Sequence, residues 1–113
     1  MLYEMTYIIL LGNSYEHLLL LQNCIHHLQP SIRTDIADTC TLAGFVRRQC
    51  PDMILLYMTT MENVHADYVH GIRNNRLADN IPLFVCRAPL AMPELATLLQ
   101  VQEKAGNGRM RDL

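Results

Sequence analysis

Three short apolar runs are the strongest constraint on how this chain folds. They lie at Tyr7–Leu11, Met53–Met58 and Ile81–Cys86, and the third contains one proline near its start. Runs of this length that are apolar at every position are typical of strands buried on both faces. Because such strands must be covered on both sides, the sequence predicts a parallel sheet with helices on both faces.

The segments between the runs have helical periodicity and helix-boundary residues. Ser14 is placed to cap a helix that stops before Pro30, and Pro93 is placed in the first turn of a last helix. Alternating residues in Ser31–Ala37 indicate a half-exposed strand. The predicted order is strand 7–11, helix 14–29, strand 31–37, helix 41–50, strand 53–58, helix 64–73, strand 81–86 and a helix from 93. This alternation favours a doubly wound α/β fold.

Composition limits the function classes. The chain has 113 residues, 50% of them apolar and 18% charged, which is typical of one packed domain. With a net charge of −2 and Lys104 as its one lysine, it lacks the basic field that nucleic-acid binding needs. No apolar run is long enough to span a membrane, and Arg33 is the first basic residue, too late for a signal peptide. We expect a cytoplasmic protein.

The cysteines and histidines suggest no cofactor or metal. Four cysteines lie in apolar segments without a C-x-x-C pair, which indicates reduced thiols and no zinc site: Cys24, Cys40, Cys50 and Cys86. No histidine pair has convincing ligand spacing. We therefore expect no bound metal and no cofactor.

Several strings resemble the receiver domain of bacterial two-component response regulators. They are the first strand at Tyr7–Leu11, the string Pro51–Leu56, the pair Ile72-Arg73 followed by Ile81–Val85, and the string Pro89–Leu95. The last string is similar to the family's entry into its final helix. The resemblance implies a CheY-like, flavodoxin-like sheet of order 2-1-3-4, with residues 1–103 forming one receiver-like domain and residues 104–113 forming a polar tail.

The positions that carry receiver chemistry are all changed. In the family, two acids after the first strand hold Mg²⁺ and an Asp at the end of the third strand accepts a phosphoryl group; the matching residues are Gly12, Asn13 and Tyr57. The two phosphate-contacting positions carry Arg87 and Ala88. A phenol forms no acyl phosphate, so we predict a domain that is neither phosphorylated nor an enzyme.

A second departure from the family concerns its fifth strand. We expect the chain to lack this strand and a neighbouring helix, since Arg87 runs almost directly into Pro89. Two alignments stay open, in which the helix from Pro93 is either the family's last helix or its fourth. Both leave the fourth strand as an open apolar edge, formed by Leu83, Phe84, Val85 and Cys86. Since monomers rarely expose such an edge, we expect a partner, most simply a second copy.

The remaining candidate residues have two interpretations each. Tyr57 either fills the vacated acidic pocket as a wedge or faces a ligand. Arg87 either meets an anion or pairs with Glu62. The turn Gly12-Asn13-Ser14 is either an ordinary tight turn or a phosphate cradle.

These observations support two functions. The first is a non-phosphorylated receiver-like domain that acts by binding a protein, such as a kinase, another regulator or an output protein, and that pairs with itself. The alternative is a sensor for a small anion or nucleotide, which would use Gly12, Ser14 and Arg87 at the ends of the strands.

Overall fold

The computed structural model describes residues 6–59, 69–73, 80–88, 91–105 and 110–112, and all structural statements below concern these ranges. Residues 69–73 are helical. The other elements are β1 (Tyr7–Gly12), α1 (Tyr15–Leu28), β2 (Arg33–Ile36), α2 (Leu42–Arg48), β3 (Met53–Met58), β4 (Leu83–Arg87), α4 (Met92–Ala105) and β5 (Met110–Asp112). The other predicted elements are therefore present with small shifts at their ends, whereas residues 64–68 of the helix predicted at 64–73 lie outside the described residues.

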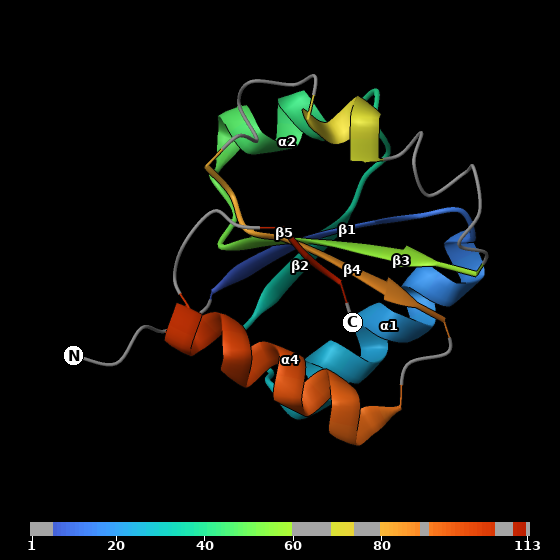
Figure 1. Ribbon diagram of the computed structural model, residues 1–113, viewed down its shortest axis with the longest axis vertical. Coiled ribbons are helices and arrows are strands. Elements are labelled where there is room, and N and C mark those ends of the chain that lie inside the picture. The colour runs from blue at the N-terminus through green and yellow to red at the C-terminus, as the bar shows by residue number, and fades with distance from the viewer. Residues whose placement is uncertain (1–5, 60–68, 74–79, 89–90, 106–109, 113) are drawn as a thin grey trace.

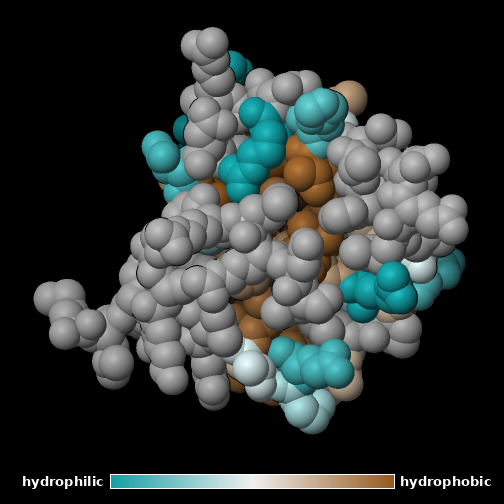
Figure 2. Space-filling model, viewed as in Figure 1, coloured by the Kyte–Doolittle hydropathy of each residue, from teal (hydrophilic) through white to brown (hydrophobic). Residues whose placement is uncertain are grey.

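The strands form one parallel sheet in the order β2-β1-β3-β4-β5. The predicted doubly wound α/β fold and its 2-1-3-4 order are thus confirmed. Helices α1 and α4 cover one face, and α2 with residues 69–73 covers the other (Figure 1). Seen from the same side, patches of apolar residues are visible near the centre of the molecule (Figure 2).

The two central strands supply side chains to both layers of the core. In β1, Ile8 and Leu10 pack toward α1 and α4, whereas Ile9 and Leu11 pack toward α2. Strand β3 is buried at every position. Alternating side chains point to opposite faces of a strand, so a strand covered on both sides must be apolar throughout.

The prediction of an open β4 edge is wrong. Strand β5 pairs with β4 in parallel, and the register joins Leu83 to Met110 and Val85 to Asp112. The predicted interface residues Leu83, Phe84, Val85 and Cys86 are all buried. The segment interpreted as a polar tail from residue 104 thus extends α4 to Ala105 and then supplies the fifth strand.

Helix α4 packs on the same face of the sheet as α1. Its residues Leu95, Leu98 and Leu99 are buried in the same cluster as Leu18 and Leu21 of α1. Strand β5 follows this helix in the chain. Both the β1–α1–β2 and the β4–α4–β5 crossover pass over the face that α1 covers. The first moves toward the β2 end of the sheet, and the second moves toward the β5 end. The two crossovers therefore have opposite hands, and one of them has the hand that parallel crossovers rarely adopt.

No helix in the described part of the chain is both long enough and apolar enough to cross a membrane.

Candidate functional site

The carboxyl edge of the sheet, where α/β proteins bind their ligands, is closed between β1 and β3. Gly12 ends β1 and is in register with Tyr57 of β3. A Cβ atom added to Gly12 would overlap the Tyr57 carbonyl oxygen and would lie 3.2 Å from Leu18 Cδ2. Because this oxygen belongs to the backbone of β3, any side chain at position 12 would require that central strand to move. An acidic side chain at position 12 is therefore excluded by the backbone of β3.

Tyr57 lies in the core between the sheet and the α1–α4 layer. Its exposed fraction is 5%, and it belongs to the same buried cluster as Leu18, Phe84 and Cys86. A phenol ring fills space and buries a large apolar area. This placement matches the wedge interpretation of Tyr57 and keeps the residue away from solvent.

Asn13 joins the loops that follow β1 and β3. Its Nδ2 donates a hydrogen bond to Thr59 Oγ1 at 2.8 Å, and its Oδ1 accepts one from the Thr59 backbone amide at 2.9 Å. Both ends of the amide are thereby used within the protein. A neutral amide oxygen that already accepts a hydrogen bond is a poor replacement for the carboxylates that hold Mg²⁺.

The residues proposed for anion contacts do not meet at one place. Ser14 caps α1, where its Oγ accepts a hydrogen bond from the His17 amide at 3.4 Å and lies 2.8 Å from His17 Nδ1. Arg87 is exposed at the end of β4, beyond β3 as seen from Gly12. Its proposed partner Glu62 lies outside the described residues. The turn Gly12-Asn13-Ser14 thus has the features of an ordinary capped helix start.

A shallow depression of about 430 Å³ lies at the carboxyl ends of β1 and β2. Its lining includes Gly12, Tyr15, Ile36 and Asp38. Hydrogen bonds from the Thr41 amide and hydroxyl and from the Cys40 amide hold the pKa of the Asp38 carboxyl below its usual value. An ionised carboxylate in the wall makes this depression unsuited to anions. The sequence analysis did not single out Asp38, although the spacing Asp38-x-x-Thr41 ahead of α2 is typical of such a turn.

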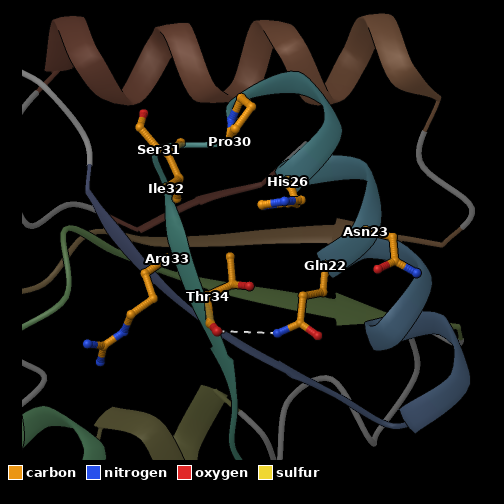
Figure 3. A pocket seen from close by; sticks show the side chains of 8 residues that line it. All are labelled: Gln22, Asn23, His26, Pro30, Ser31, Ile32, Arg33 and Thr34. Atoms are coloured by element: carbon orange, nitrogen blue, oxygen red, sulfur yellow. Dashed lines mark hydrogen bonds between the residues drawn. The ribbon is translucent and has the colours of Figure 1, made fainter.

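A second groove, of about 460 Å³, runs between α1 and β2 (Figure 3). Gln22, Asn23 and His26 line it from the helix. The Gln22 amide crosses the groove and donates a hydrogen bond to the Thr34 backbone oxygen at 3.2 Å. Nothing in the sequence pattern marked Gln22, because its partner is a backbone atom of another element.

Burial makes the Cys86 thiol unreactive. Desolvation, with a smaller contribution from Glu94, raises the pKa of Cys86 to about 12. The thiolate is the nucleophilic form of cysteine, and almost none of it is present near neutral pH. Cys86 is therefore excluded as a nucleophile.

We expect a thiol reagent at pH 8 to separate the cysteines into classes. Cys40 and Cys50 are exposed and should react first, Cys24 is half-buried and should be slower, and Cys86 should react only when the protein unfolds. Mass spectrometry of timed iodoacetamide reactions measures this order. Labelling of Cys86 at the rate of Cys40 in the native protein would contradict its placement.

In the described ranges, no three His, Cys, Asp or Glu side chains gather into a group that could hold a metal ion. No family model matches the chain, and the comparisons with curated proteins and with solved structures gave no match. What the domain does must therefore be argued from its fold and from the geometry of this sheet edge.

Proposed function

We propose that the chain is a receiver-like domain of a response-regulator-like signalling protein, that it takes up no phosphoryl group, and that it acts in the cytoplasm by binding proteins. Support comes from the 2-1-3-4 parallel order, which receivers share, combined with the replaced residues at the carboxyl edge. A fold can be kept while the site grafted on it is lost.

The close approach of the Gly12 backbone to the Tyr57 carbonyl group is the observation that carries this proposal. Phosphoryl transfer to a receiver needs an exposed carboxylate beside a bound Mg²⁺. Here the acceptor position is buried, one metal position admits no side chain, and the other is occupied by hydrogen bonds to Thr59. With this chemistry gone, binding is the activity that the scaffold can still perform.

The surface of α1 offers apolar contact area for a protein partner. Tyr15 and Leu20 expose 64% and 63% of their surface, and Leu19 exposes 38%. Large apolar side chains that gather at the start of one helix are more typical of an interaction surface than single exposed residues are. A kinase, another regulator, an output protein or a second copy could each use such a surface.

Incubation with a small-molecule phosphoryl donor and Mg²⁺ tests the proposal. We expect the intact mass of the chain to stay unchanged, because none of the described residues at the carboxyl edge combines a carboxylate with a metal site. A conventional receiver domain in the same reaction shows that the donor is active. Stoichiometric addition of one phosphoryl group would refute the proposal.

The alternative, a sensor for an anion or nucleotide, has less support. Gly12, Ser14 and Arg87 line no common described cavity, and Ser14 is engaged as a helix cap. The depression that Gly12 does line contains the Asp38 carboxylate, which repels anions.

A further inference from the structure

Strand β2 is one of the two edge strands of the sheet, and β5 is the other. Strand β2 ends the strand order, and no described strand pairs with its outer side. The amides of Arg33 and Ala37 donate hydrogen bonds to Thr6 and Leu10, so they point toward β1. Because hydrogen-bonding groups alternate in direction along a strand, the N–H and C=O of Thr34 point outward.

One outward backbone group of β2, the Thr34 carbonyl oxygen, accepts its hydrogen bond from a side chain and not from a strand. The Gln22 amide donates to the Thr34 oxygen, the same bond that the backbone N–H of an added strand would make (Figure 3). Exposed edges of this kind are the places where sheets accept another strand. The groove beside Thr34 follows the edge and leaves room along it.

The sequence of this edge is complementary to itself. Residues Ile32 to Ile36 read apolar, cation, Thr, anion, apolar. If a second copy pairs antiparallel with Thr34 opposite Thr34, then Arg33 of each copy faces Asp35 of the other and Ile32 faces Ile36. Opposite charges, β-branched pairs and Thr–Thr pairs are each favourable directly across an antiparallel ladder. The two outward groups of Thr34 would bond to those of its counterpart.

Helix α1 adds a second contact beside the same edge. Gln22, Asn23 and His26 lie along the groove with β2, and Tyr15 lines the depression at the other end of β2 with Ile36. Leu19 falls between them at helical spacing on the same side. A two-fold axis through Thr34, perpendicular to the sheet, brings this side of α1 toward its counterpart. Tyr15 and Leu19, both exposed in one copy, would then be covered.

We propose that two copies of this chain pair through β2, antiparallel and centred on Thr34, to form one continuous sheet. The pairing replaces the Gln22 amide on the Thr34 oxygen by a backbone amide. Self-association would then use β2 and not β4. The dimer proposal rests on the proposed function only in that both assign the domain a binding role. If the protein were a monomer and still accepted no phosphoryl group, the β2 interface would be overturned and the proposed function would not.

Charge exchange at β2 tests the register. Arg33→Asp and Asp35→Arg each place like charges opposite each other at two positions of the interface, and each should weaken dimerisation about tenfold or more. An equimolar mixture of the two variants restores opposite charges at every position, so it should form the heterodimer. Sedimentation velocity and native mass spectrometry measure both results. Unchanged self-association of either variant would overturn the register.

A cysteine at the two-fold axis tests the same geometry if the charge variants fold poorly. Thr34 residues facing each other in an antiparallel pair have Cα atoms about 5.5 Å apart, within the range of a disulfide. In a background with Cys24, Cys40 and Cys50 changed to Ser, Thr34→Cys should form a disulfide dimer on mild oxidation. Arg47→Cys, exposed on α2, is the matched control and should stay monomeric.

Three outcomes would overturn the interface. One is a wild-type protein that sediments as a monomer at tens of micromolar, in which case Gln22 simply protects the edge. Another is cross-linking of Thr34→Cys no faster than that of Arg47→Cys. Binding of an extended segment from a different protein to β2, without self-association, would also contradict the proposal.

Discussion

Replacing Gly12 by Ala is expected to lower the free energy of unfolding by about 3 kcal/mol, the upper end of the usual cost of overpacking. The added methyl group would overlap the Tyr57 carbonyl oxygen, an atom of the central strand β3. A flexible side chain could move aside, but β3 is held between β1 and β4 by backbone hydrogen bonds. Urea unfolding followed by circular dichroism measures the loss.

Gly44→Ala is the matched control for this substitution. Gly44 lies inside α2, and a Cβ atom added there has no neighbour within 4 Å. Alanine favours a helix interior over glycine by about 1 kcal/mol, so this variant should be more stable than the wild type. The account would be contradicted if the two variants had the same stability.

The second large effect is expected from Tyr57→Asp, which places an aspartate at the position that the proposed receiver-like function assigns to the phosphoryl acceptor. Because Tyr57 lies in the buried cluster beside Phe84 and Cys86, an aspartate there would be an uncompensated charge, at a cost of about 3 to 5 kcal/mol. The variant should be largely unfolded at neutral pH. Its stability relative to the wild type should rise as the pH falls, because protonation removes the charge.

Tyr57→Phe keeps the ring and is the control for lost volume. We expect it to stay within about 1.5 kcal/mol of the wild type, the contribution of one ordinary hydrogen bond. Thermal and urea unfolding across pH 4 to 8 compares the three proteins. A Tyr57→Asp variant that is as stable as the wild type and that accepts phosphate from a donor would show that the site is intact except for its acid.

Local sequence patterns were sufficient for the central part of the fold. Strand β3 has the predicted bounds, and Ser14 caps α1 as expected, because burial on both faces and helix capping each depend on residues close together in the chain. Strand β5 could not be found in this way. Its three residues have no strand pattern, and α4 separates them from β4 on the face that α1 occupies. The usual connection rules favour a crossover of the other hand.

For the candidate site, the sequence suggested which residues to examine and left their geometry open. The resemblance to receiver domains singled out Gly12, Asn13 and Tyr57. It could not indicate that Gly12 touches a backbone carbonyl of β3, or that the Asn13 amide is used by Thr59, since these contacts join residues more than 40 positions apart. The Gln22–Thr34 bond was missed because it joins a side chain of α1 to a backbone oxygen of β2, which no sequence pattern marks.

The closed carboxyl edge is tested most directly by titrating the isotopically labelled protein with Mg²⁺ and following the backbone amide signals by NMR. The account predicts no saturable shift at Gly12, Asn13, Tyr57 or Thr59, because Gly12 is sterically closed, Asn13 is engaged and Tyr57 is buried. Saturable shifts confined to these four residues at millimolar Mg²⁺ would show that a metal site survives there and would contradict the account.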